Sequence, residues 1–344
     1  MKLKYCIILV FIIALSHGIL PAQEDCSITL KQAENLYDAG NIEEIPGMLD
    51  MCLRSGLNKD ERLRAYRLMI LAYLFEDKKE LAEDYMLKLL KQEPEYKVNE
   101  SIEPAEFVYL FNSYRTLPVY SIGLITGINT TSIRVKGLYG VHDVVSSEYD
   151  YNSAGFGYQF GVKLNRYIAS GLELNLELML VQNNYEYVDT IFDFAFVSFD
   201  ERQTRMDLPI SATYEFGKNK IKPYIKAGAT GSYMVSSYST AVRTYTDNSH
   251  KDITGSDINL LEYRNNMNLS GLVGIGAKYK IRKGYFFLEA RYNYGLFNQV
   301  NQDTRYTNPE LIYKYFYIDN DFTLNNIFIS VGYMYSIYKP KKKI

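Results

Sequence analysis

Acid–base chemistry would have to come from very few side chains in this sequence. It contains three histidines, and only His142 and His250 lie beyond the N-terminal apolar segment. His142 stands beside Asp143 and close to Ser146 and Ser147, so a serine, a histidine and an acid occur within one short segment. The members of a catalytic triad usually come from separate elements of a fold, and closeness in sequence is a weak indicator. We therefore expect no enzyme, and a lipid-modifying activity at this segment is the less favoured alternative.

Metal and phosphate chemistry are not indicated either. A zinc site needs several ligands in one place, whereas the two histidines lie in different segments of the chain. Gly271, Gly274 and Gly276 fall within a stretch of strand-like alternation, where small residues make room for bulky neighbours. A phosphate-binding loop would instead require glycines at a turn from a strand into a helix. We expect no cofactor and no bound metal.

Cys26 and Cys52 are spaced as if they met at one end of a helical hairpin. One stands at the start of the first predicted helix and the other near the end of its antiparallel partner. An oxidising compartment permits a disulfide between them. Closing a loop of roughly 25 residues would contribute about 3 kcal/mol in the chain-entropy model. The alternative is a pair of buried free thiols, because cysteine also packs well as a small hydrophobe.

Charged residues are more informative in the C-terminal two thirds of the chain, where apolar and polar residues alternate. A period of two places the apolar side chains of a strand on one face and the polar ones on the other. The residues predicted to share the polar, interior face are Lys163, Arg205, Lys222, Lys226, Lys278, Arg291, Glu173, Glu177, Asp207, Glu215 and Glu289. Because positive and negative members are nearly balanced, we expect a cross-braced network of ion pairs.

The elements that position these charges are eight alternating segments between Val119 and Tyr338. In the clearest one, leucines from Leu172 to Leu180 alternate with Glu173, Asn175 and Glu177. Each segment is long enough for the roughly 9 to 11 residues of a tilted membrane strand. The segments are 119–131, 156–164, 172–180, 205–215, 221–238, 267–279, 286–294 and 326–335.

Connection lengths distinguish a membrane barrel from a soluble sandwich. Short polar turns at 164–168, 216–221 and 280–285 alternate with long polar connections. The long connections are 132–154, 189–201, 239–266 and 298–323. This alternation is typical of bacterial outer-membrane barrels with periplasmic turns and extracellular loops. Eight strands leave an interior that side chains just fill, so a closed lumen is favoured over a pore, since unpaired charges there would be costly to desolvate.

The N-terminus has the layout of a secretory signal peptide, residues 1–22. Lys2 and Lys4 precede an apolar run of about ten residues, which is shorter than the roughly 20 of a spanning helix. Cleavage is expected after Ala22, with Gly18 as the alternative, and Cys26 lies too far from the apolar run for lipidation. The 38 basic residues nearly balance the 40 acidic ones, so nucleic-acid binding is not expected.

Residues 23–97 have a helical period with turns near Gly40 and Gly56. Two degenerate 34-residue units can be laid over this region, which resembles a tetratricopeptide-like pair of helical hairpins. Residues 98–118 read as a linker with a short amphipathic helix over Ala105–Arg115, residues 119–338 as the barrel, and residues 339–344 as a basic tail.

An aromatic cluster stands in the last long connection. Its members are Tyr306, Tyr313, Tyr315, Phe316 and Tyr317. An exposed cluster of this kind could bind a partner or a glycan. It could equally extend the strands above the membrane, and the sequence leaves both interpretations open.

Three segments of the barrel region resemble the PorT-like outer-membrane β-barrel family of Bacteroidota. They are Tyr120-Ser-Ile-Gly-Leu-Ile-Thr-Gly-Ile-Asn129, Met206-Asp-Leu-Pro-Ile210 and Lys222-Pro-Tyr-Ile-Lys-Ala-Gly228. The resemblance covers about residues 116 to 338 and carries no catalytic residues. It implies an outer-membrane location, and some family members are linked to type IX secretion.

The sequence therefore predicts an α+β multidomain protein in which an eight-stranded antiparallel transmembrane β-barrel follows a small all-α tetratricopeptide-like domain. We expect the N-terminal domain and the C-terminus to lie in the periplasm. The expected partners are outer-membrane lipid, a periplasmic protein or the cell wall through the helical domain, and the barrel-assembly machinery during biogenesis. The favoured role is a non-enzymatic binding or assembly component, and a small-solute channel is the main alternative.

Overall fold

The computed structural model describes residues 21–139, 149–152, 154–191, 194–217, 219–247 and 250–343. They form two compact units. A helical unit extends to Leu117 and takes in the residues from Tyr338 onward, and a barrel unit comprises Pro118–Ile337. None of the described helices combines the length and the apolar character needed to cross a bilayer.

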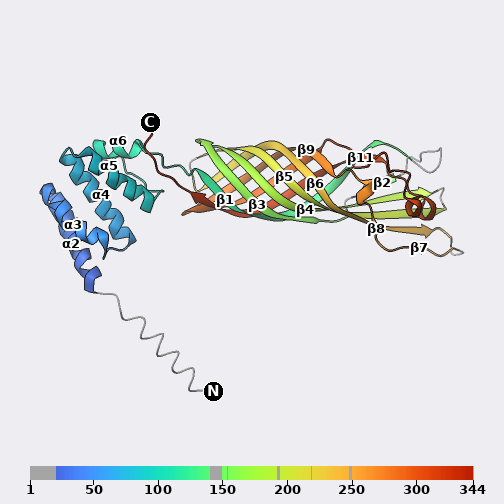
Figure 1. Ribbon diagram of the computed structural model, residues 1–344, viewed down its shortest axis with the longest axis horizontal. Coiled ribbons are helices and arrows are strands. Elements are labelled where there is room, and N and C mark those ends of the chain that lie inside the picture. Colours follow the sequence, from blue (N-terminus) through green and yellow to red (C-terminus); the bar gives the residue numbers. More distant parts are fainter. Residues whose placement is uncertain are drawn as a thin grey trace, which may run out of the picture. The chain divides into compact units, whose positions relative to one another are not determined.

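The helical unit consists of antiparallel helices joined by short turns (Figure 1). Asn58 and Glu61 start the helix that begins at Lys59 with a reciprocal capping box, in which each side chain accepts a backbone N–H at 2.9 Å. Pro46 lies in the first turn of its helix, where a proline costs no intrahelical hydrogen bond. The elements are α2 (Pro21–Asp38), η1 (Ile42–Glu44), α3 (Ile45–Arg54), α4 (Lys59–Phe75), α5 (Lys79–Gln92) and α6 (Ala105–Asn112).

This unit has an apolar core of its own. Ala33 and Ala82 are fully buried where helices approach closely, and Met69, Met86 and Leu89 fill the space between them. The core explains the helical period of the sequence. The tetratricopeptide-like character of the hairpins stays a prediction.

The basic tail belongs to the helical unit. The backbone N–H of Arg115 donates to the carbonyl of Lys341 at 2.9 Å, and that of Lys343 donates to Ser113 at 2.7 Å. The ammonium of Lys342 lies 2.5 Å from the carboxylate of Glu83. The last residues of the chain are thus held against the segment that follows α6.

In the barrel unit, eight long antiparallel strands close on themselves among the described residues. Strand β1 pairs with both β3 and β11, and the β4–β5 pair completes the ring in the order β1-β3-β4-β5-β6-β9-β10-β11. The strands are β1 (Tyr120–Gly137), β3 (Gly157–Ala169), β4 (Leu172–Ile191), β5 (Ala195–Glu215), β6 (Ile221–Tyr245), β9 (Met267–Ile281), β10 (Gly284–Gly295) and β11 (Asp321–Ile337). The predicted eight-stranded antiparallel barrel is confirmed.

Three short strands extend the barrel at the end opposite the short turns. Strand β2 (Tyr149–Asn152) pairs with β4, while β7 (Ile253–Thr254) and β8 (Ile258–Asn259) pair with β6.

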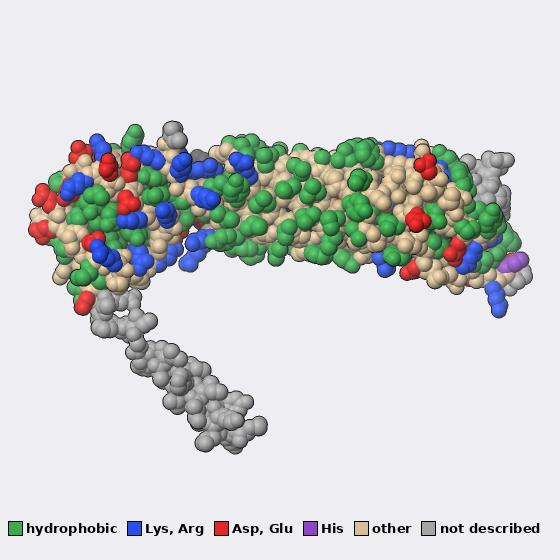
Figure 2. Space-filling model, in the orientation of Figure 1, with side chains coloured by type: hydrophobic (Ala, Val, Ile, Leu, Met, Phe, Trp, Pro, Cys, Tyr) green, Lys and Arg blue, Asp and Glu red, His purple; other side chains and the backbone are tan. Residues whose placement is uncertain are grey.

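The two faces of the barrel wall differ sharply in chemistry. Along β4, Leu174, Leu176 and Leu178 are exposed on the outside, while Glu173 and Glu177 are buried inside. Figure 2 shows the resulting apolar cover on the outer surface of the barrel. The alternation seen in the sequence is therefore the alternation between a wall surface and an interior.

One predicted long connection is wrong. Residues 189–201 were expected to form a long polar loop, but β4 continues to Ile191 and β5 begins at Ala195. The inward side chains of Tyr185 and Phe199 are almost fully buried there. In this hairpin the alternation is present with reversed polarity: Val197 and Phe199 are buried inside, whereas Asp200 is exposed outside. The pattern of apolar outer and polar inner residues that marks the other strands is therefore missing here.

Candidate functional site

Of the two histidines, only His250 lies in the part of the chain that the structure describes. His142, Asp143, Ser146 and Ser147 lie outside the described residues. His250 is half exposed, with its Nδ1 at 2.9 Å from Asp247 and its ring stacked on Tyr245. Nor do any three described His, Cys, Asp or Glu side chains form a group that could hold a metal ion.

All eleven residues predicted to face the interior do so. Nine are buried, and Glu215 and Lys222 are partly exposed at the end of the barrel where the short turns lie. Nine of the eleven form ion pairs, which are arranged in two clusters.

The central cluster joins two carboxylates to three cations. Glu177 lies 2.5 Å from Lys226, 2.9 Å from Arg291 and 3.4 Å from Lys163. Glu289 lies 3.0 Å from Lys226 and 3.4 Å from Lys163. The Tyr224 hydroxyl donates to Glu289 at 2.9 Å. Since each partner is desolvated, every one of these charges depends on the others.

Gly276 makes room for this arrangement. A Cβ added to it would lie 2.4 Å from the ring of Tyr224. The sequence predicted that small residues in this strand make room for bulky neighbours, and at Gly276 the absence of a side chain leaves space for the Tyr224 ring.

The second cluster lies beside the short turns. Lys278 is 2.6 Å from Glu173 and 2.5 Å from Glu215, and Lys222 is 3.1 Å from Glu215. The Asn165 amide adds a hydrogen bond of 3.0 Å to Glu173. This end of the interior is therefore also filled by paired charges.

Arg205 and Asp207 do not join either cluster as ion pairs. Arg205 donates to the side-chain oxygens of Gln203 and Gln299 instead of to a carboxylate. Its Nε and the Oδ1 of Asp207 have no hydrogen-bond partner among the described protein atoms.

A third cluster was missed by the sequence analysis. Arg264 places its guanidinium 2.5 Å from Glu201 and 2.7 Å from Asp319, and all three side chains are buried. Arg264 and Asp319 stand in connections between strands, where no alternation marks a residue as interior. Only the assembled barrel brings them to Glu201.

The aromatic cluster of the last connection is divided between surface and interior. Tyr306 and Tyr313 are 60% and 78% exposed, and Phe316 is partly exposed. Tyr315 and Tyr317 are buried, and the ring of Tyr317 stacks on Phe199 at 4.4 Å. Neither an exposed five-membered cluster nor a strand extension is found, because this connection folds inward through η3 (Glu310–Lys314) and packs on the barrel end (Figure 1).

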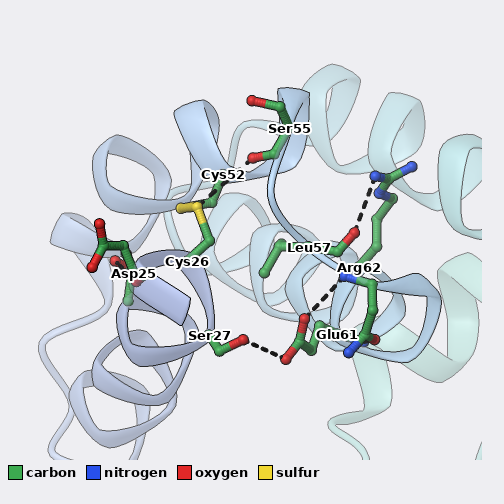
Figure 3. Close-up of a disulfide and its surroundings, with 10 residues drawn as sticks. Asp25, Cys26, Ser27, Cys52, Ser55, Leu57, Glu61 and Arg62 are labelled. Carbon is green, nitrogen blue, oxygen red and sulfur yellow. Dashed lines mark hydrogen bonds between the residues drawn. A yellow bond between two sulfur atoms is a disulfide. The ribbon is translucent and has the colours of Figure 1, made fainter. Parts of the chain in front are cut away.

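In the helical unit, a disulfide joins Cys26 to Cys52, with an S–S distance of 2.12 Å and a Cα–Cα distance of 5.4 Å (Figure 3). It ties α2 to α3. Beside it, the Ser27 hydroxyl donates to Glu61 at 2.6 Å and connects α2 to the start of α4.

The same unit has a small apolar pocket of about 270 Å³. Its wall comes from α2, η1, α4 and the start of α6. The lining residues are Tyr37, Ile42, Leu71, Leu74, Phe75, Pro104 and Glu106. Phe75 is 63% exposed at this pocket.

Comparison with known proteins gives one family match. A family model described as an outer membrane protein β-barrel domain matches residues 120–301. None of the curated proteins matches the sequence.

Several solved outer membrane protein structures are similar to part of the chain. Neisserial surface protein A is 15% identical, with a TM-score of 0.32, over 63% of this chain and 97% of its own. OprG from Pseudomonas aeruginosa is 11% identical, with a TM-score of 0.36, over 65% and 98%. The outer membrane protease OmpT from Escherichia coli is 10% identical, with a TM-score of 0.32, over 64% and 97%.

Proposed function

This chain belongs to the outer membrane β-barrel protein family, and from that premise we propose that it is a non-enzymatic binding or assembly component of the cell envelope. In this proposal the barrel is an anchor in the outer membrane. The helical unit lies in the periplasm, together with the C-terminus, and engages a periplasmic protein or the cell wall. The signal peptide, the PorT-like relationship to Bacteroidota proteins and the tetratricopeptide-like nature of the helices are parts of the same proposal.

The observation that carries the proposal is the filled interior of the barrel. Lys163, Lys226 and Arg291 cross the lumen to Glu177 and Glu289, and Arg264 with its two carboxylates occupies the far end. Passage of a solute would have to break several desolvated ion pairs, each of which is costly to open. A filled barrel of this kind favours anchoring over transport, and single-channel recording in planar bilayers should give no conductance steps.

The pocket of the helical unit supports the partner-binding half of the proposal. Exposed apolar side chains in a concave surface are typical of protein interaction sites. Phe75 is the most accessible large apolar side chain of the lining and would be the main anchor for a partner.

Site-specific photo-crosslinking in cells tests this role. A photoreactive residue at Phe75 is expected to give a discrete adduct with an envelope protein or with peptidoglycan. The matched control is the same probe at Met51, which is 77% exposed on the same unit but does not line the pocket. Equal adducts at both positions, or none at Phe75, would contradict the proposal.

A further inference from the structure

The short turns of the barrel carry an unusual concentration of positive charge. Arg166, Lys220, Arg282 and Lys283, here called the cationic rim, are all exposed. Residues 164–172, 216–222 and 280–285, which make up the turns and their flanks, include no acidic residue. The nearest carboxylate along the chain, Glu215, is engaged by Lys278 and Lys222. Figure 2 shows Lys and Arg side chains gathered at this end of the barrel.

The cationic rim surrounds the barrel. Arg166 lies at the end of β3, Lys220 stands immediately before β6, and Arg282 and Lys283 join β9 to β10. In the closed strand order these positions follow one another around the circumference. A protein that docked on one side of the barrel would meet only part of this ring, whereas a plane of headgroups would meet all of it.

Aromatic side chains mark the same level of the wall. Tyr214, Phe216, Tyr279, Phe286, Tyr333 and Tyr335 are exposed on the outer surface next to the short turns. Such rings sit at the headgroup level of a bilayer, and cations immediately beyond them lie where lipid phosphates are found.

We propose that the cationic rim binds the phosphates of anionic phospholipids in the leaflet that surrounds the short turns. This inference depends on the barrel family and not on the partner proposed for the helical unit. Each cation near an anionic membrane surface favours contact with the lipid headgroups by about fivefold. Several such cations together hold the barrel at a defined depth in the bilayer.

The test uses the full chain reconstituted in vesicles of phosphatidylcholine, or of phosphatidylcholine mixed with phosphatidylglycerol. The ratio of folded to unfolded barrel in urea should be at least about tenfold higher in the anionic vesicles at low salt. This increase in the ratio of folded to unfolded barrel should disappear at about 1 M salt, where the Debye screening length is about 3 Å. Inorganic phosphate added to phosphatidylcholine vesicles should not reproduce it.

Three variants separate the rim from other effects. The rim variant combines Lys220→Gln, Arg282→Gln and Lys283→Gln, and it should lose most of the higher stability in anionic vesicles. The charge-conserving variant combines Lys220→Arg, Arg282→Lys and Lys283→Arg, and it should retain that higher stability. The matched control, Lys136→Gln with Lys251→Gln and Lys314→Gln, removes two exposed cations and one partly exposed cation from the opposite end and should also retain the higher stability.

The proposal is overturned if the wild-type barrel is equally stable in both lipids, or if the control variant loses as much as the rim variant. It is also overturned if salt lowers the stability of the barrel as much in phosphatidylcholine vesicles as in anionic vesicles. The charges of the rim would then interact with other groups of the protein and not with lipid. None of these outcomes affects the crosslinking result at Phe75.

Discussion

Leu176 and Glu177 are neighbours in the chain and occupy opposite environments. Leu176 is 44% exposed on the outer face, and Glu177 is 1% exposed among three cations. The sequence assigned the two faces through their period. It gave no way to foresee that one carboxylate would serve Lys163, Lys226 and Arg291 together, since these residues lie on three other strands.

We predict that both Leu176→Arg and Glu177→Gln destabilise the barrel, for different reasons. An arginine on the lipid face near the midplane costs about 2 to 4 kcal/mol. Removing one partner of a buried ion cluster costs about 3 to 5 kcal/mol, because the cations remain without a counter-charge. Adding Lys163→Met should recover part of the loss in Glu177→Gln and none of it in Leu176→Arg. Urea unfolding in bilayers measures the stability of the two single variants and of each combined with Lys163→Met. If Lys163→Met restored stability equally in both backgrounds, the outer and inner faces would be assigned wrongly.

Among the elements, the strands were predictable where an apolar face meets the outside. The segments 172–180 and 286–294 fall within β4 and β10. Beyond that region, as at 189–201, the strands were not predicted, because there the apolar side chains face the interior and the outer side chains are mostly polar. Nor was η3 predicted, and Tyr315 and Tyr317, which follow it and are buried, are aromatic residues in a connection without a strand period. The third ion cluster was not predicted because Arg264 and Asp319 also stand in connections, where no alternation marks a residue as interior.

At the start of α4, a pH-dependent contribution to stability is expected. The Ser27 hydroxyl and the backbone amide of Asn58 hold the pKa of the Glu61 carboxyl below its usual range. A lowered pKa in the folded state stabilises the unit above the unfolded pKa of about 4.3, and that stability is lost as the pH falls through the folded value. Wild type should therefore exceed Glu61→Gln in urea resistance at pH 7, and the difference should shrink as the pH falls below the unfolded pKa of about 4.3. A difference that is independent of pH would exclude the charged cap.

The tie between α2 and α3 can be tested by thiol labelling. We expect Cys26 and Cys52 to be protected from a maleimide in the oxidised protein until a reductant is added, because both sulfurs are in the disulfide. Reduction should destabilise the helical unit by about 3 kcal/mol, through the loop-closure entropy of a loop of this length. Complete labelling of both thiols without reductant would contradict this expectation.

At the scale of the whole molecule, each unit has a separate source of stability. The helical unit is held by an apolar core and a disulfide, whereas the barrel is held by a closed ladder of strand pairs around paired charges. The sequence indicated this division through its change of period after Pro118. It did not indicate that the chain would return to the helical unit after the last strand, because four lysines at a terminus are equally compatible with a solvated tail.

We therefore predict two unfolding transitions for the reconstituted protein in urea. Helical circular dichroism should be lost first, and the barrel should keep its heat-modifiable gel mobility, because a closed ladder without free edges resists opening in lipid. Cys52→Ser should shift only the first transition, and Glu177→Gln only the second, since substitutions at distant independent sites act separately. A single transition displaced by both substitutions would show that the two units unfold as one.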